Sequence, residues 1–147
     1  MPIKFYFVLL CASGLVLSSC VTASDHKLLY KAATDGNVSA IEALLDNGVL
    51  VNQDYSGWTA LGTAAYHGYA DVVKLLLDRG ADIDFSIPQK DGTTALSYAA
   101  LGGHIEIAKN LIAKGADIRR AVDSLNRMFA GSETQMGIEL LERLQGK

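Results

Sequence analysis

The sequence of 147 residues contains only two cysteines, Cys11 and Cys20, and both lie near its amino terminus. A cleavage that removes residues 1–19 leaves Cys20 as the only thiol, so an internal disulfide is then excluded. A single cysteine at the cut site of a chain that is otherwise free of cysteine indicates a chemical role for that thiol.

An excess of basic charge is also missing. The chain has 13 Lys and Arg residues against 16 Asp and Glu residues, for a formal net charge of −3. A nucleic-acid-binding domain needs a basic patch or stripe. The composition therefore argues against a nucleic-acid partner.

Catalytic and metal-binding motifs are absent from the sequence. It has no G-x-S-x-G nucleophile elbow, no phosphate-binding glycine loop and no H-E-x-x-H pair. The histidines, His26, His67 and His104, are scattered along the chain, which favours turn or capping roles over a metal site. We expect neither enzymatic activity nor a cofactor nor a bound metal.

The apolar run Phe5–Leu17 is too short to cross a bilayer, which takes about 20 residues. Lys4 precedes this run, and the small residues Ser18 and Ser19 follow it. A positive residue, a short apolar core and a small-residue end are typical of an export signal, whereas a buried amino-terminal helix would not need that end. We predict that residues 1–19 are a signal peptide.

Three segments of the chain repeat one pattern, and they align without gaps over residues 27–51, 59–83 and 94–118. Each copy carries an alanine pair, then a glycine, then an apolar stretch that ends at a second glycine. In the middle copy, the first helix ends at Gly68, and the second helix, which contains Leu76, ends at Gly80. Such helix pairs bury their apolar faces only by stacking on one another, so we expect Leu76 in a continuous core.

The middle and third copies resemble the ankyrin repeat. They read DYSGWTALGTAAYHGYADVVKLLLDRGADID and QKDGTTALSYAALGGHIEIAKNLIAKGADI. Ala60 and Ala95 stand where the family has proline, and Gly62 and Ser97 replace its histidine, which is expected to weaken the polar network between turns. The resemblance implies an all-α solenoid of about three repeats with short β-hairpin fingers and a protein-binding concave face.

The resemblance also divides the chain into parts. A short tether at 20–24 leads into three repeats at 25–118, of which the first looks like an amino-terminal cap. Residues 119–147 contain two amphipathic segments and are expected to form carboxy-terminal capping helices. The finger between Gly80 and Gly92 is longer than the one between Gly48 and Gly57. Its Phe85, Ile87 and Pro88 either contact a partner or belong to an insertion that has no role in binding.

The residues around the predicted cut resemble a second family. Leu17-Ser18-Ser19-Cys20 is similar to the lipobox of bacterial lipoproteins. This implies that Cys20 is acylated and becomes the new amino terminus, and Val21 after it implies sorting to the outer membrane, facing the periplasm. An ordinary signal peptidase cut after Ala23 is the alternative, and it leaves a soluble periplasmic protein.

The ankyrin resemblance places the variable positions of the concave face. The middle copy is aromatic there, and Tyr and Trp dominate interface hot spots. The alternative for Trp58 is packing against a neighbouring finger. The predicted partner-binding residues are Tyr55, Ser56, Trp58, Tyr66, His67, Lys90, Asp91, Thr93 and Leu101.

These resemblances imply a monomeric, non-enzymatic binding module that is held in the cell envelope. Small exported ankyrin lipoproteins resemble immunity proteins, which would cover the active site of a secreted, lipase-like toxin. A scaffold that docks an envelope enzyme, such as one of peroxide defence, is the alternative.

Overall fold

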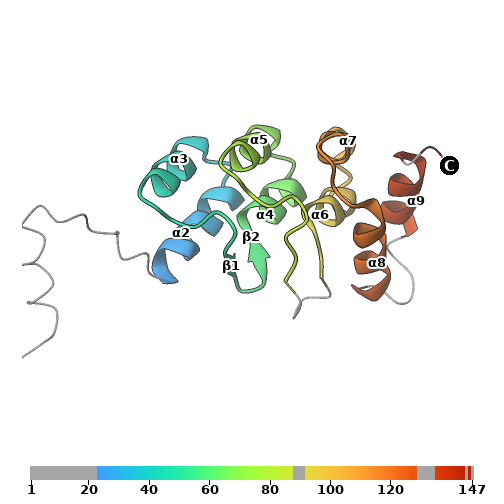
Figure 1. Cartoon of the computed structure of the whole chain (residues 1–147), viewed down its shortest axis with the longest axis horizontal. Coiled ribbons are helices and arrows are strands. Elements are labelled where there is room, and N and C mark those ends of the chain that lie inside the picture. Colours follow the sequence, from blue (N-terminus) through green and yellow to red (C-terminus); the bar gives the residue numbers. More distant parts are fainter. Residues whose placement is uncertain (1–22, 88–91, 129–134, 145, 147) are drawn as a thin grey trace, which may run out of the picture.

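The computed structural model describes residues 23–87, 92–128, 135–144 and 146. Within these ranges the chain forms eight α-helices and one two-stranded antiparallel sheet, which confirms the expected all-α fold class (Figure 1). In chain order the elements are α2 (Ala23–Thr34), α3 (Val38–Asp46), β1 (Asp54–Tyr55), β2 (Trp58–Thr59), α4 (Ala60–His67), α5 (Ala70–Asp78), α6 (Ala95–Leu101), α7 (Ile105–Ala113), α8 (Ile118–Met128) and α9 (Gln135–Leu144).

The amino-terminal predictions fall mostly outside these ranges. The predicted signal peptide and Cys20 lie outside the described residues. Helix α2 begins at Ala23. The last two residues of the predicted tether at 20–24 are therefore helical.

Each repeat is a pair of helices joined by a tight turn. Figure 1 shows the pairs α2–α3, α4–α5 and α6–α7 stacked side by side along the molecule. Gly68 ends α4 with φ at 83°, a left-handed conformation that most side chains disfavour. The N–H of Tyr69 then bonds the carbonyl of Ala64, which closes the turn. The predicted break at Gly68 is confirmed.

Polar side chains fix where helices α4 and α3 begin. The Thr59 hydroxyl accepts a hydrogen bond from the N–H of Gly62 at 2.9 Å, and Asn37 caps α3 through Ala40 in the same way at 3.0 Å. Such N-caps satisfy N–H groups that have no partner inside the helix.

The core runs through all the repeats. The side chains of Ala33, Ala64 and Ala65 are fully buried, and small side chains let α4 pack closely between α2 and α6. Leu76 and Leu111 of the second helices are also fully buried. The expected core position of Leu76 is confirmed.

The first finger ends in the only β-hairpin of the described residues. Asp54 pairs with Thr59 and Tyr55 with Trp58. Both turn residues between the strands have positive φ, 55° at Ser56 and 83° at Gly57, as a two-residue hairpin turn requires. The Asp54 carboxylate accepts the N–H of Gly57 at 3.1 Å. In the second finger, residues 85–87 form no strand, and residues 88–91 lie outside the described ranges.

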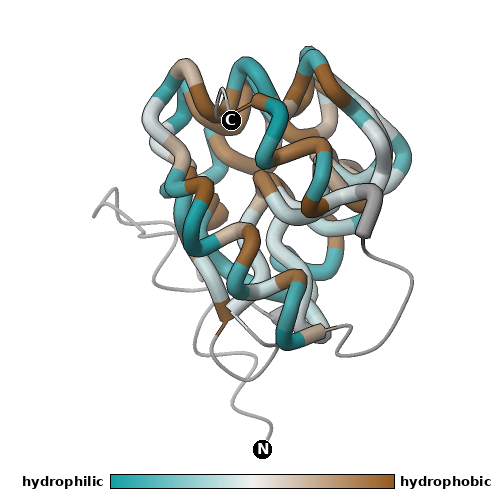
Figure 2. The backbone as a smooth tube through the Cα atoms, turned by 90° about the vertical axis from the view of Figure 1, so that its right-hand side faces the viewer, coloured by the Kyte–Doolittle hydropathy of each residue, from teal (hydrophilic) through white to brown (hydrophobic). Residues whose placement is uncertain are grey.

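Helices α8 and α9 cover the last repeat, as expected for a carboxy-terminal cap. Leu125 and Leu141 are fully buried, whereas Glu142 and Arg143 are exposed. Figure 2, which views the molecule from the side of this cap, shows hydrophobic and hydrophilic residues alternating along the helices. The alternation is typical of helices with one buried face.

Ser97, where the family has histidine, belongs to a buried polar network. Its hydroxyl contacts that of Thr94 at 3.0 Å within a capping box at the start of α6. It also lies 2.7 Å from the hydroxyl of Ser124 on α8, which donates to the carbonyl of Ala121. In place of the family's histidine, the smaller side chain of Ser97 links α6 to the cap.

Candidate functional site

Five aromatic side chains from two repeats pack together, and we call them the aromatic cluster. Trp58 lies on β2, and Tyr66 and His67 lie in the last turn of α4. Tyr69 precedes α5, and Tyr98 lies in α6. The predicted residues Trp58, Tyr66 and His67 are thus brought together, and Tyr69 and Tyr98 join them.

The rings of the aromatic cluster meet in defined geometries. Trp58 stacks on Tyr98 with 4.4 Å between ring centroids and 24° between the ring planes. Tyr66 stands across both rings, at 66° to Trp58 and 83° to Tyr98, with centroid distances of 5.8 Å and 6.4 Å. Stacked and edge-to-face pairs of this kind each contribute about 0.5–1.5 kcal/mol beyond the burial of area.

Tyr98 fits into the cluster because Gly62 has no side chain. A Cβ atom on Gly62 would lie 2.8 Å from the Tyr98 ring, inside van der Waals contact. The Tyr98 side chain is 7% exposed, and its hydroxyl is hydrogen-bonded with Thr93. Burial raises the pKa of the Tyr98 phenol above its ordinary value of 10.0, while the bond with Thr93 acts in the opposite direction.

Tyr98 was not among the predicted site residues. The available signal was Gly62, which stands where the family has a histidine and leaves room for another ring. A glycine at that position predicts a space but does not say which distant side chain fills it.

Tyr69 of the cluster and one further ring, that of His104, each lie over a glycine of the preceding repeat. The Tyr69 ring covers Gly36, and the His104 ring covers Gly68. The Nε2–H of His104 also donates to the carbonyl of Tyr66, with 2.9 Å between the two atoms. The His104 side chain makes no cap bond to α7, and its ring instead ties the start of α7 to the end of α4.

Part of the aromatic cluster is open to solvent. Tyr66 is 41% exposed and Tyr69 is 37% exposed, and His67 is exposed as well. Trp58 is half-buried, because Tyr98 covers one face of its ring. The alternative prediction was packing against a neighbouring finger, whereas the ring that Trp58 packs on belongs to helix α6.

The other predicted site residues divide into three groups. Tyr55 is half-buried and packs on Tyr30 at 5.5 Å, Ser56 is exposed at the hairpin tip and Leu101 is half-buried. Thr93 is only 6% exposed, so its predicted place on the contact surface is wrong; its hydroxyl supports Tyr98 from within. Lys90 and Asp91 lie outside the described residues.

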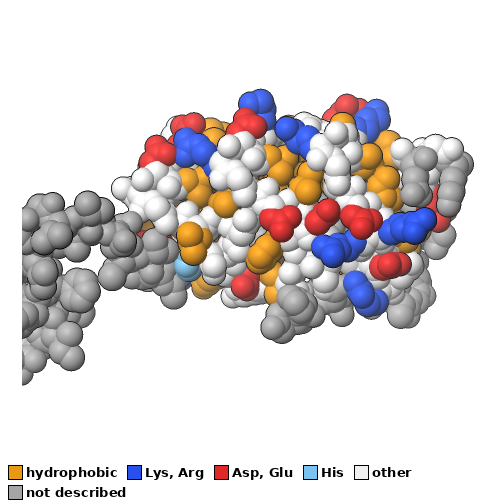
Figure 3. All heavy atoms as spheres, in the orientation of Figure 1, with side chains coloured by type: hydrophobic (Ala, Val, Ile, Leu, Met, Phe, Trp, Pro, Cys, Tyr) orange, Lys and Arg blue, Asp and Glu red, His pale blue; other side chains and the backbone are white. Residues whose placement is uncertain are grey.

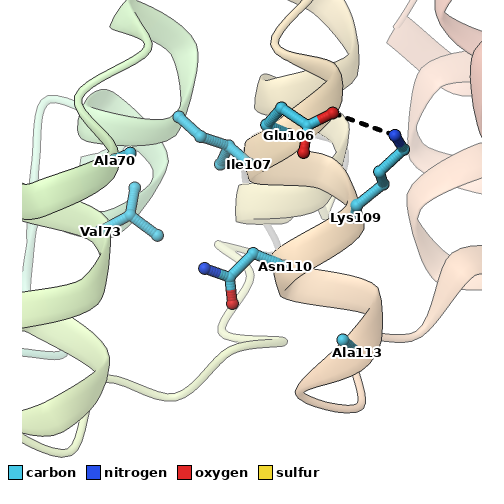
Figure 4. A pocket seen from close by; sticks show the side chains of 7 residues that line it. All are labelled: Ala70, Val73, Glu106, Ile107, Lys109, Asn110 and Ala113. Atoms are coloured by element: carbon cyan, nitrogen blue, oxygen red, sulfur yellow. Dashed lines mark hydrogen bonds and ion pairs between the residues drawn. The ribbon is translucent and has the colours of Figure 1, made fainter.

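A separate groove of about 470 Å³ lies between the second helices α5 and α7 (Figure 4). Its apolar lining includes Val73 and Ile107, the Asn110 amide points into it, and the ammonium group of Lys109 pairs with Glu106 at 3.0 Å on its rim. This lining holds no histidine, serine or cysteine that could act as a nucleophile or base.

Charged side chains of both signs are interspersed on the face in Figure 3. Along the second helices they form ion pairs, such as Arg79 with Asp46 across α5 and α3 at 2.6 Å. Within the described ranges, no three His, Cys, Asp or Glu side chains are grouped to hold a metal ion. No described helix combines the length and apolar character needed to span a membrane.

Comparison with known proteins identifies the repeat. A family model described as ankyrin repeats in three copies matches residues 7–87, more than half of the chain. A second model, described as ankyrin repeats in many copies, matches residues 64–112. Residues 7–22 of the first match lie outside the described part of the structure.

Several curated proteins share this part of the sequence. The African elephant (Loxodonta africana) protein named "Ankyrin repeat, SAM and basic leucine zipper domain-containing protein 1" is 39% identical over 75 residues, which are 50% of this chain and 16% of that protein. The human and sheep (Ovis aries) proteins of the same name are each 46% identical over 56 residues, which are 37% of this chain and 12% of each relative. The chain therefore spans only a small part of these relatives.

Proposed function

Because this chain belongs to the ankyrin-repeat family, we propose that it is a non-enzymatic module that binds a partner protein through the aromatic cluster. The observation that carries this proposal is the exposure of Tyr66, His67 and Tyr69 beside the stacked Trp58–Tyr98 pair. Tyr and Trp are the residues most enriched at interface hot spots.

The packing of the cluster favours binding because the rings are already ordered. Tyr66 is held across Trp58 and Tyr98, and its backbone carbonyl is bonded to His104. Ordering one flexible side chain on binding costs about 0.5–1.5 kcal/mol, and a pre-ordered ring avoids most of that cost.

We further propose that the module is anchored in a bacterial outer membrane through acylated Cys20, facing the periplasm. The support is the Leu17–Cys20 segment, which has the lipobox pattern. Two or three acyl chains give stable anchoring, whereas one is marginal. A cut after Ala23 would instead leave a soluble periplasmic protein, and mass spectrometry of the mature amino terminus distinguishes the two.

The finer proposal is that the module is an immunity protein. The aromatic cluster would occlude the active site of a secreted, lipase-like toxin, and the anchor would hold the module where the toxin acts. The alternative is a scaffold that docks an envelope enzyme, such as one of peroxide defence. Co-expression with a toxin encoded by a neighbouring gene separates the two, because only an immunity protein restores growth.

Replacement of Tyr66 by alanine tests the binding site. We expect Tyr66→Ala to weaken binding of the neighbour-encoded partner by about 2 kcal/mol or more, the range of a hot-spot residue. Its unfolding temperature should fall as well, because the ring makes edge-to-face contacts with Trp58 and Tyr98, so binding is measured well below the melting temperature, where the variant is folded. Titration calorimetry and a thermal melt measure the two effects. Trp58→Ala should weaken binding too, but it also removes the stacking on Tyr98 and so lowers stability.

The exposed Arg143 on α9 provides the control, because Arg143→Ala should leave both binding and melting unchanged. Unaltered affinity of the Tyr66 variant would show that the aromatic cluster is structural. The contact surface would then have to be sought elsewhere, with the second finger around Phe85 as the next candidate.

A further inference from the structure

The first repeat exposes two leucines at the end of the array. Leu28 is 50% exposed and Leu50 is 56% exposed, the two largest exposures among the big apolar side chains of the described residues. In the repeat alignment Leu28 corresponds to Ala60 and Ala95, which are 2% and 3% exposed. Those alanines lie where successive repeats pack together, so Leu28 marks the side of α2 that faces no other repeat among the described residues.

Leu50 lies on the same side of the first repeat as Leu28. It corresponds to Asp82 and Asp117. The N–H of Asp82 donates to the Asn52 side chain at 2.8 Å, and the N–H of Asp117 donates to the Asp84 carboxylate at 2.9 Å. In both cases the acceptor belongs to the preceding finger. Position 50 of the first repeat therefore faces the side where a preceding finger would lie.

Two lysines flank Leu28 on this surface. Lys27 and Lys31 are both exposed. In the later repeats the position of Lys31 is taken by Thr63 and by Tyr98, and both of these side chains are buried. Lys31 pairs with the exposed carboxylate of Asp35 at 2.7 Å, a contact that contributes little in water. We call the surface formed by Lys27, Leu28, Lys31 and Leu50 the N-terminal end face.

The two ends of the array differ. At the other end, α8 and α9 cover the last repeat and bury Leu125 and Leu141 (Figure 1). Arrays of repeats need polar terminal surfaces to stay soluble. An end face that carries leucines among lysines combines the two features by which peripheral proteins bind anionic lipid surfaces.

The chain itself limits how far this end face lies from the anchor. Cys20 precedes Ala23, the first residue of α2, by three positions. A fully extended chain spans at most about 3.6 Å per residue, or roughly 11 Å for this connection. An acyl group on Cys20 therefore holds the first repeat at the bilayer surface.

We propose that the N-terminal end face lies against the lipid surface. Leu28 and Leu50 enter the boundary between headgroups and acyl chains, and Lys27 and Lys31 face the phosphates. This inference rests on the proposed acylation of Cys20. It orients the array with the repeats stacked away from the membrane, so that the aromatic cluster of the second and third repeats is held clear of the lipid.

Site-specific labelling of the acylated full chain tests this orientation. The protein is reconstituted into vesicles of phosphatidylethanolamine and phosphatidylglycerol that contain a headgroup-region spin-labelled lipid. Leu28→Cys and Leu50→Cys are each labelled with an environment-sensitive fluorophore. Acylation blocks the Cys20 sulfur, so the introduced thiol is the reactive one. We expect the lipid quencher to reduce fluorescence at positions 28 and 50, and not at the control Arg143→Cys on the distal cap.

Each outcome has a distinct meaning. An acyl mass on Cys20 with equal quenching at 28, 50 and 143 overturns the orientation and leaves the anchor in place. A mature chain without an acyl mass overturns both the anchor and this inference. A third outcome is that the labels at 28 and 50 are not quenched by the lipid, while chemical cross-linking shows that two copies of the protein pair through their first repeats. That result assigns the end face to a second copy and overturns the proposal.

A matched variant separates lipid contact from loss of the fold. Leu28→Ala with Leu50→Asp gives the first repeat the residues that the third repeat carries at Ala95 and Asp117, so its melting temperature should hold. A label on Lys27→Cys reports on the end face in both backgrounds. We expect weaker lipid quenching of this label in the double variant. Unchanged quenching would show that the leucines do not hold the end face on the lipid.

Discussion

Gly62 shows how one residue controls the aromatic cluster. Its missing side chain leaves room for the Tyr98 ring, and that ring in turn supports Trp58. Glycine within a helix lowers helix stability by about 0.8–1 kcal/mol relative to alanine. We infer that at this position the packing of the Tyr98 ring stabilises the fold by more than the glycine destabilises the helix.

Replacing Gly62 tests this balance. We expect Gly62→Ala to lower the free energy of unfolding by about 1–3 kcal/mol, the cost of overpacking a core, despite the better helix propensity of alanine. In a Tyr98→Ala background the same change should raise it by about 1 kcal/mol, because the clash is gone and only propensity remains. Urea unfolding of the four proteins gives the cycle. The same sign in both backgrounds would contradict the proposed contact.

The raised pKa of Tyr98 predicts how stability changes with pH. The unfolded chain releases the phenol proton near the ordinary pKa of 10.0, whereas the folded chain releases it at higher pH because the ring is buried. Between these values the folded state binds more protons, so stability falls as pH rises above about 10 and continues to fall through the folded pKa. We expect Tyr98→Phe to make this fall shallower. Urea unfolding at several pH values between neutral and alkaline measures it, and equal slopes would contradict the assignment.

At the residue scale the sequence predicted exposed positions better than supporting ones. Tyr66 and His67 were placed on the surface from their repeat positions alone, and they are exposed. Thr93 was misplaced, and Tyr98 was missed. Both errors have one cause: the contact of Tyr98 with Gly62 joins two repeats, and the spacing within one repeat does not encode which ring crosses to the next.

At the scale of elements, the carboxy-terminal cap is held by more than apolar packing. Ser97 on α6 and Ser124 on α8 share a hydrogen bond between fully buried hydroxyls. A buried polar group that loses its partner costs about 1–3 kcal/mol. The amphipathic pattern of residues 119–147 predicted the cap. It did not predict this bond, because nothing in the sequence pattern marks Ser124 as a partner of Ser97.

Removal of either hydroxyl should loosen α8. We expect Ser97→Ala and Ser124→Ala each to lower the free energy of unfolding by about 1–3 kcal/mol, and the double variant to cost less than the sum, because the bond between the two serines can be lost only once. Faster hydrogen exchange in α8 and α9 should accompany the loss. Ser39→Ala, at an exposed position of α3, is the control and should change nothing. Additive losses would argue against a direct bond.

At the scale of the whole molecule, the repeat alignment predicted the fold, because three copies in register describe one structural unit and its stacking. It did not predict what each copy meets at its ends. Leu28 and Ala60 occupy the same repeat position, yet one is half exposed and the other is buried, since within the described residues only Ala60 has a repeat before it. Burial in an array therefore depends on position along the array as well as on position within the repeat.

The same dependence makes the array unfold as one unit. Leu76 is fully buried in the middle repeat, which has neighbours on both sides. Leu76→Ala should lower the free energy of unfolding by about 2–5 kcal/mol, as for other large-to-small core changes. Domain stabilities are only about 5–15 kcal/mol, and about three repeats are the minimum for a stable array, so the flanking repeats should not persist alone.

Trp58, the single tryptophan, reports on the middle repeat, and far-ultraviolet circular dichroism reports on all helices. We expect both signals to shift together to a lower temperature. A melt unaffected by the substitution would remove Leu76 from the core, and a helical signal that outlasts the tryptophan signal would show that the repeats unfold separately.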